Sequence, residues 1–140
     1  MNNENEMNTN QLLSYPLERF LHWEKTQPNK VYMTQPFPDG KVVDYTWAEV
    51  GDQVRRMAAY LVSLDLPKKS HIALLGKNSA HWIMADIAIW MAGHVSVPVY
   101  PTMSGESAGY VIEHSDAIML MLGKMDGVTD NWNGIEPHLP

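Results

Sequence analysis

Three short runs of consecutive apolar residues in the second half of the chain predict buried β-strands. They span residues 71–75, 95–100 and 117–122. Continuous apolar runs of this length, bounded by glycine or proline, are typical of strands covered on both faces of a parallel sheet. Pro98 and Pro101 further predict that the second strand ends there or lies at an edge of the sheet.

An almost uniformly apolar segment between the first two runs predicts a helix over residues 79–92. Asn78 or Ser79 can cap its first turn, because either side chain accepts a hydrogen bond from a backbone N–H. Gly93 suits the left-handed conformation that ends many helices. Strand, helix and strand then form one right-handed βαβ unit. Because a helix that is apolar nearly all round needs cover on most sides, we expect some apolar surface to stay exposed and to promote self-association.

The first half of the chain predicts two helices and a hairpin. Pro16, near a first helical position, indicates a short helix. Residues 31–34 and 41–45 are β-prone runs joined by a segment containing Pro-Asp-Gly, which predicts an antiparallel hairpin. Thr46 and Glu49 have the spacing of a capping box, which opens a second, longer helix.

The remaining segments carry weaker signals. Ser104 can cap a helix that continues to about residue 115, although its two glycines each weaken it by roughly 1 kcal/mol relative to alanine. Residues 127–140 are polar, and we predict no helix or strand there, with Trp132 and Ile135 as apolar anchors. Residues 1–13 are rich in asparagine and predict a disordered lead, which leaves residues 14–140 as the folded segment.

These elements predict an α/β fold class: a partial doubly wound, mostly parallel sheet with flanking helices and an added β-hairpin. A net charge of −6 and a pI near 5.4 argue against a nucleic-acid-binding or anionic-membrane surface. The absence of cysteine excludes disulfides and thiolate metal sites. Without a signal peptide or a transmembrane segment in the sequence, we expect a cytoplasmic protein, with peripheral membrane association as the alternative.

The sequence contains none of the compact motifs that hold nucleotides, metals or catalytic nucleophiles. The dipeptide at residues 76–77 (GK) superficially resembles a phosphate loop, but that motif requires Gly in place of His71 and Ser or Thr in place of Asn78. No G-x-G-x-x-G, G-x-S-x-G or H-E-x-x-H pattern occurs. Residues 114–116 (HSD) include the residue types of a catalytic triad, but neighbours in sequence cannot converge as a triad requires. We therefore assign no catalytic residue and no metal ligand.

Three segments in a fixed order resemble the AMP-forming acyl-CoA synthetases. They are residues 77–82 (KNSAHW), 88–94 (AIWMAGH) and 97–102 (VPVYPT), and within the adenylate-forming superfamily they are most similar to long-chain fatty-acid–CoA ligases. The resemblance covers all but the first residues of the chain. It implies that residues 14–140 are the N-terminal segment of the AMP-binding domain of a much longer enzyme. Members of this family usually carry glycines where Asp65 and Lys69 stand, which leaves the geometry of that turn uncertain.

The resemblance also implies a reaction. The full enzyme joins a fatty acid to AMP, using ATP and Mg²⁺, and then exchanges AMP for coenzyme A. In the family the phosphate-gripping loop, the Mg²⁺-binding acid and the catalytic lysine all lie beyond the equivalent of Pro140. We therefore expect this segment to be inactive alone and to bind none of these cofactors tightly.

By the same analogy Tyr100, Pro101 and Thr102 border the coenzyme A side of the cleft. The alternative is a purely structural turn, in which Pro101 fixes the backbone and Tyr100 fills a pocket. At the level of the whole chain, the competing hypothesis is a stand-alone, non-catalytic α/β module for binding or interaction.

Overall fold

The computed structural model describes residues 15–125 and 129–140. The predicted disordered lead, residues 1–13, lies outside the described residues, as does Ser14. The chain divides into two compact units, Met1–Gln53 and Val54–Pro140, each of which has its own internal packing.

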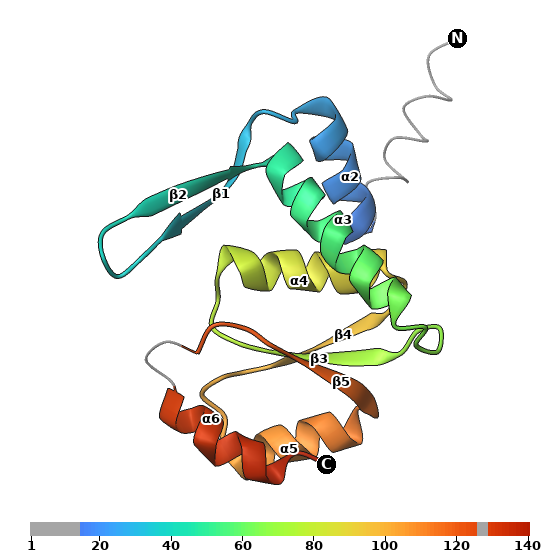
Figure 1. The fold of residues 1–140 in the computed structure, drawn as a ribbon, viewed down its shortest axis with the longest axis vertical. Coiled ribbons are helices and arrows are strands. Elements are labelled where there is room, and N and C mark those ends of the chain that lie inside the picture. The colour runs from blue at the N-terminus through green and yellow to red at the C-terminus, as the bar shows by residue number, and fades with distance from the viewer. Residues whose placement is uncertain (1–14, 126–128) are drawn as a thin grey trace. The chain divides into compact units, whose positions relative to one another are not determined.

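The first unit contains a helix, a hairpin and the start of a second helix (Figure 1). Helix α2 (Pro16–Thr26) begins at the predicted proline. Strands β1 (Val31–Pro36) and β2 (Val42–Thr46) pair in antiparallel fashion, which confirms the hairpin. Helix α3 (Trp47–Ser63) follows directly and continues into the second unit.

Three aromatic rings form the centre of the first unit. Tyr32 and Trp47 are stacked with ring centroids 3.7 Å apart, and Phe20 packs against them at 6.1 and 5.8 Å, respectively. Burial in this cluster raises the pKa of the Tyr32 hydroxyl, because the charged phenolate loses its hydration there. The rings therefore connect α2, β1 and the first residue of α3.

The predicted capping box at the start of α3 is confirmed. The backbone N–H of Thr46 donates to the Glu49 carboxylate at 2.8 Å, and the Glu49 N–H donates to the Thr46 hydroxyl at 3.3 Å. The bond from the Thr46 backbone is the main reason why the pKa of Glu49 is lowered.

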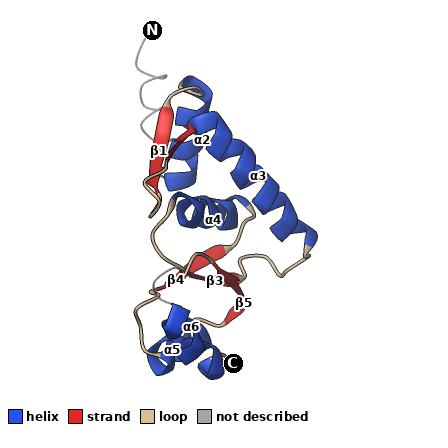
Figure 2. Ribbon diagram, turned by 60° about the vertical axis from the view of Figure 1, so that its left-hand side comes forward, coloured by secondary structure: helices blue, strands red, loops and turns tan. Residues whose placement is uncertain are grey.

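The second unit is built on a parallel three-stranded sheet of order β4-β3-β5. Its elements follow one another as β3 (His71–Leu75), α4 (Ala80–Met91), β4 (Val95–Val99), α5 (Gly105–His114) and β5 (Ala117–Leu122). Figure 2 shows α4 on one side of the sheet and α5 with α6 on the other. This arrangement confirms the predicted α/β fold class, and β4 lies at a sheet edge as Pro98 indicated.

Alternate residues of the central strand β3 face two separate hydrophobic clusters. Ile72 and Leu74 pack with residues of α3 and α4 on one side of the sheet. Ala73 and Leu75 pack with α5 and with the C-terminal residues on the other. Because both faces are covered, β3 has the continuous apolar sequence expected of an interior parallel strand.

The caps of the two crossover helices also agree with the sequence. The Ser79 side chain accepts a hydrogen bond from the Trp82 N–H at 3.1 Å, which identifies Ser79, rather than Asn78, as the cap of α4. Gly93 has a φ of 82° just after α4. Ser104 caps α5 by accepting from the Ser107 N–H at 3.2 Å.

One prediction is wrong: residues 127–140 contain helical structure. Helix α6 (Thr129–Ile135) and the short 3₁₀ helix η1 (Glu136–His138) pack against α5. Ile135 is fully buried in the cluster on that side of the sheet, so it does act as an anchor. The close approach depends on Gly105, where a Cβ atom would lie 1.9 Å from the Gly134 carbonyl oxygen.

Asp65 and Lys69 stand where members of the acyl-CoA synthetase family usually carry glycine. Both have backbone angles that favour glycine. Asp65 has a φ of 51° and Lys69 a φ of 60°, both in the left-handed region. The turn between α3 and β3 therefore keeps the geometry that glycine would favour, with non-glycine residues in it.

Candidate functional site

The candidate site is the edge of the sheet at which all three parallel strands end. Residues 76–79 follow β3, residues 100–104 follow β4 and residues 123–125 follow β5. In open α/β sheets ligands bind outside the carboxyl ends of the strands, because the loops there diverge toward opposite faces. The loops at this edge are therefore the first place to look for function.

Tyr100, Pro101 and Thr102 form a tight turn at this edge, directly after β4. The Met103 N–H donates to the Tyr100 carbonyl at 3.1 Å and closes the turn. The Tyr100 side chain is 68% exposed, so the suggestion that it fills a pocket is wrong. The structure brings these three residues together at the strand end where the sequence placed them, and their role toward coenzyme A stays a prediction.

The strand order creates a switch point between β3 and β5. The chain leaves β3 toward α4 on one face, whereas it leaves β5 toward α6 on the other. At this point the two loops are joined through their backbones. The Gly123 N–H donates to the Leu75 carbonyl at 2.7 Å, and the Lys77 N–H donates to the Lys124 carbonyl at 2.9 Å.

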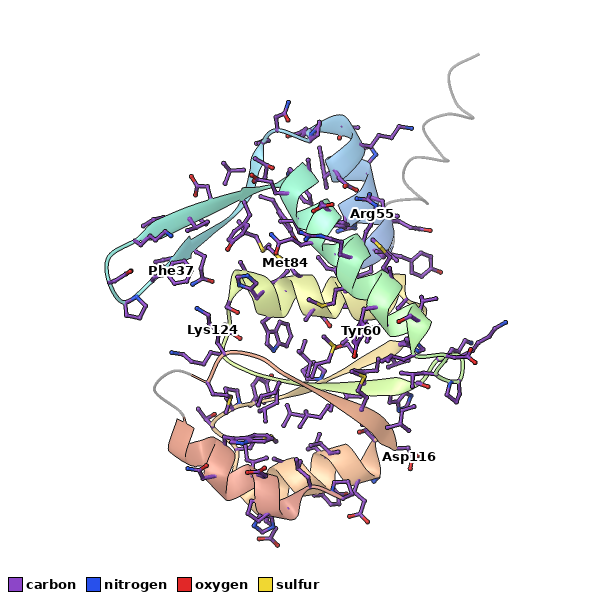
Figure 3. The ribbon with its side chains drawn as sticks, in the orientation of Figure 1. Phe37, Arg55, Tyr60, Met84, Asp116 and Lys124 are labelled. Carbon is purple, nitrogen blue, oxygen red and sulfur yellow. The ribbon has the colours of Figure 1, made fainter. Side chains whose placement is uncertain are left out.

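The contact between these two loops favours glycine at position 76. A Cβ atom on Gly76 would lie 3.0 Å from the Cα atom of Gly123, closer than side chains normally approach a backbone. The two backbones therefore meet directly, and the lysine that follows each glycine is held at the switch point with an exposed side chain. Figure 3 shows Lys124 at this end of the sheet.

Lys77 and Lys124 are site residues that sequence reasoning missed. The signal was present as a repeated Leu-Gly-Lys sequence, at residues 75–77 and 122–124, directly after two predicted strands. Helices α4 and α5 also begin at this edge, and helix N-termini favour negative charge. The local electrostatics therefore suit an anionic group such as a phosphate.

A second set of polar side chains lies away from the candidate edge: Asp86 on α4, and His94 and Ser96 around the start of β4. Burial raises the pKa of the Asp86 carboxyl, and the nearby Ser96 hydroxyl offsets part of this rise. Within the described residues, His94 Nδ1 is also buried without a hydrogen-bond partner. His94 and Ser96 lie at the start of β4, the opposite end of that strand from the candidate edge, so we do not assign this group to the site.

A hollow of about 730 Å³ lies on the outer surface of α5. Glu106 and Glu113 contribute carboxylates to its lining, and His138 closes one side. Two carboxylates repel an anionic ligand, so this hollow does not fit a phosphate. Within the described residues, no cluster of acidic, histidine or cysteine side chains could hold a metal ion. No helix in that part of the chain is long and apolar enough to cross a membrane.

One known protein family matches this chain over most of the residues that form the two units. The model of the AMP-binding enzyme family aligns with residues 20–138. The chain belongs to the AMP-binding enzyme family. This family relationship covers both the hairpin unit and the three-stranded sheet with its candidate edge.

Curated relatives in the AMP-binding family include several long-chain-fatty-acid–CoA ligases. The ligase FadD15 of Mycobacterium bovis is 33% identical over 97 residues, which cover 69% of this chain and 16% of the relative. The ligase ACSBG2 of Rattus norvegicus is 31% identical over 77 residues, which cover 55% of this chain and 12% of the relative. This chain therefore spans only a small part of the length of the ligases that it matches.

Solved structures share the fold. The fatty acid AMP ligase from Legionella pneumophila superposes with a TM-score of 0.70 at 18% identity, covering 80% of this chain and 20% of the ligase. The anthranilate CoA ligase AuaEII, solved in complex with anthranoyl-AMP, gives a TM-score of 0.69 at 18% identity, covering 88% of this chain and 23% of that protein. At such identities the likeness concerns the fold.

Proposed function

We propose that this chain is the N-terminal part of an ATP-dependent, AMP-forming fatty acid–CoA ligase. The observation that carries the proposal is the family match over residues 20–138, together with ligase relatives of which the chain covers only 16% or less. In the complete reaction a fatty-acid carboxylate attacks the α-phosphorus of ATP and releases pyrophosphate. The thiol of coenzyme A then displaces AMP from the acyl-adenylate to give a thioester.

In this proposal residues 14–140 form the first segment of the AMP-binding domain and are inactive alone. Adenylation depends on positioned charges around the phosphates. At the strand ends Lys77, Lys124 and the start of α4 fit a negatively charged group. The described residues contain no cluster that fits Mg²⁺. The segment thus supplies part of a phosphate-facing edge, and the rest of the enzyme supplies the other charged groups.

The turn of Tyr100, Pro101 and Thr102 borders the coenzyme A side of the cleft in this proposal. Its support is the position of the turn at the carboxyl end of β4 and the exposure of Tyr100. An exposed aromatic ring at the end of a strand can contact a bound ligand.

Two assays test the proposal. The purified chain, given ATP, Mg²⁺, a fatty acid and coenzyme A, is expected to release no pyrophosphate above the blank. A chimera of Mycobacterium bovis FadD15, in which the 97 matched residues of this chain replace the matched segment of the ligase, is expected to retain ligase activity.

A matched control for the chimera carries the segment of FadD15 itself with the same junction residues. If the control is active and the chimera is folded but inactive, the proposal fails, and the stand-alone non-catalytic module becomes the better hypothesis. Sustained turnover by the purified chain alone would contradict its inactivity.

A further inference from the structure

Asn133 and Gly134 form the single Asn-Gly pair of the sequence, and they lie in the last turn of α6. Both residues are exposed. An asparagine followed by glycine is prone to deamidation, because glycine has no side chain to hinder the approach of its backbone nitrogen to the asparagine side chain. The pair is therefore chemically reactive wherever its backbone is free to move.

The reaction requires only water as a co-reactant. The backbone nitrogen of Gly134 attacks the side-chain carbonyl carbon of Asn133 and forms a C–N bond. The proton that this nitrogen loses leaves with the side-chain nitrogen as ammonia. Water then opens the cyclic imide at either carbonyl and gives aspartate or isoaspartate. A carboxylate thus replaces an amide, and the isoaspartyl product also has an extra methylene group in its backbone.

Helical structure prevents this ring closure. In an α-helix the N–H of residue 134 donates to the carbonyl four residues earlier, and the helical ψ angle of Asn133 holds the Gly134 nitrogen away from the side-chain carbon. Helix α6 has only seven residues, and isolated helices of this length are unstable in water. The pair is therefore protected only while tertiary contacts hold α6 in place.

Helix α6 and η1 are held against α5, which Figure 1 shows beside α6. Gly105 and Gly109 lie one turn apart on α5. Cβ atoms at these positions would lie 1.9 Å from the Gly134 carbonyl oxygen and 2.4 Å from the His138 carbonyl oxygen, respectively. Ile135 is fully buried in the cluster on that side of the sheet. All of these residues lie within the family match, residues 20–138.

We propose that Asn133 is a deamidation site whose reactivity is controlled by the docking of α6 on α5. While α6 is docked, Asn133 is protected. When α6 detaches, Asn133 deamidates, and the product prevents α6 from docking again. The modification thereby converts a reversible local opening into a permanent one.

Two features of the product oppose docking. The extra methylene group of isoaspartate displaces the Gly134 carbonyl, which already lies too close to Gly105 to move toward it. The new carboxylate lies at the C-terminal end of α6, where the helix dipole disfavours negative charge, and Glu136 follows just beyond. Detachment of α6 withdraws Ile135 from its cluster and exposes apolar surface.

The test follows deamidation of the full chain at neutral pH by peptide mass spectrometry, folded and in guanidinium chloride. Asn133 is expected to react at least about tenfold more slowly in the folded chain. Gly105→Ala should speed the folded reaction about tenfold, which corresponds to about 1.4 kcal/mol of lost docking free energy, and should leave the denatured rate unchanged. Asn78, exposed in the loop after β3, is the internal reference, and its rate should not change.

A milder variant covers the case in which Gly105→Ala does not fold. Ile135→Val removes one buried methylene group and should speed the folded reaction of Asn133 about two- to tenfold. Gly134→Ala is the matched control, because a Cβ there would meet nothing within 4 Å, whereas the added methyl group hinders attack by the backbone nitrogen. This control should fold normally and deamidate far more slowly even when denatured.

The deamidated chain, separated by ion exchange, should unfold at a lower urea concentration than the unmodified chain and should bind a hydrophobic dye. Four outcomes overturn the proposal. The first is an equal rate for Asn133 in the folded and denatured chain. The second is a folded variant with weakened docking in which Asn133 reacts no faster. The third is equal acceleration of Asn78, which would mean that deamidation follows global unfolding. The fourth is a deamidated chain with an unchanged urea midpoint and no dye binding, which would mean that α6 docks again.

Discussion

Asp65 and Lys69 adopt left-handed backbone angles that cost most side-chain-bearing residues free energy. Their φ values of 51° and 60° lie in the turn between α3 and β3, where both side chains are exposed. A left-handed conformation costs an L-residue roughly 1–2 kcal/mol relative to the right-handed one, and Asp tolerates it better than Lys. Lys69 is therefore the more strained of the two.

Replacing Lys69 with glycine is expected to stabilise the protein. Glycine removes the Cβ strain but increases the conformational entropy of the unfolded chain, so the net gain in unfolding free energy is roughly 0.5–1 kcal/mol. Urea denaturation measures it. Lys68→Gly is the matched control, because Lys68 is an exposed neighbour of the same type without a positive φ. The control should lose stability, and a loss in both variants would show that Lys69 is unstrained.

For single residues, the sequence predicted where a residue lies in the fold better than it predicted what that residue does. The turn at Tyr100 lies at the strand end where the pattern placed it, since a proline after an apolar run marks that boundary. Lys77 and Lys124 escaped prediction because each was considered only within its own segment. Their proximity arises from the pairing of β3 with β5, which local patterning does not specify.

Helix α5 shows how a residue that weakens an element alone can be necessary for its packing. Gly105 lowers the intrinsic helix propensity, but a Cβ there would meet the Gly134 carbonyl at 1.9 Å and the His138 ring at 2.6 Å. The backbones of α5 and α6 are therefore in direct contact. For alanine in place of Gly105, helix propensity and packing therefore predict changes of opposite sign in the free energy of unfolding.

Gly105→Ala is expected to destabilise the protein by about 1–3 kcal/mol, because the added methyl group must displace α6. Propensity alone would predict a gain of about 1 kcal/mol. Gly134→Ala is the matched control in α6, where a Cβ would meet nothing within 4 Å, and it should be neutral or stabilising. Urea midpoints of the two variants give the comparison, and a stabilising Gly105→Ala would disprove the close contact.

At the scale of elements, periodicity and caps predicted the helices and strands from residue 16 to residue 122. Helix α6 was missed because its sequence carries few apolar residues and a glycine. It is held by tertiary contacts of Trp132 and Ile135 with the cluster beneath the sheet. Such contacts override weak propensity, and a single sequence does not reveal them.

For the whole molecule, the proposed coenzyme A side of the cleft gives a prediction in the active FadD15 chimera. Thr102→Trp adds a bulky ring to the turn after β4 and leaves Lys77 and Lys124 in place. Adenylation, measured as pyrophosphate release, should be nearly unchanged. Thioester formation should fall, with the KM for coenzyme A rising by a factor equivalent to roughly 1–3 kcal/mol of lost binding.

Tyr110→Trp is the matched control, since Tyr110 is exposed on α5 outside the turn, and it should leave both half-reactions unchanged. Equal damage to both half-reactions by Thr102→Trp would show that the turn is structural. No damage to either would show that it lies away from the cleft.

The central position of β3 has a consequence for the order of events during synthesis. Leu75 and Leu122, which end the paired strands β3 and β5, lie 47 positions apart in the chain. At roughly 5–20 residues per second, a ribosome needs about 2–9 seconds to add that length. Throughout this interval β3, the most buried strand of the described sheet, lacks one of its two neighbours. The strand at the centre of the sheet is thus made before both of its neighbours, and its edge toward β5 stays open to incorrect pairing until β5 is synthesised.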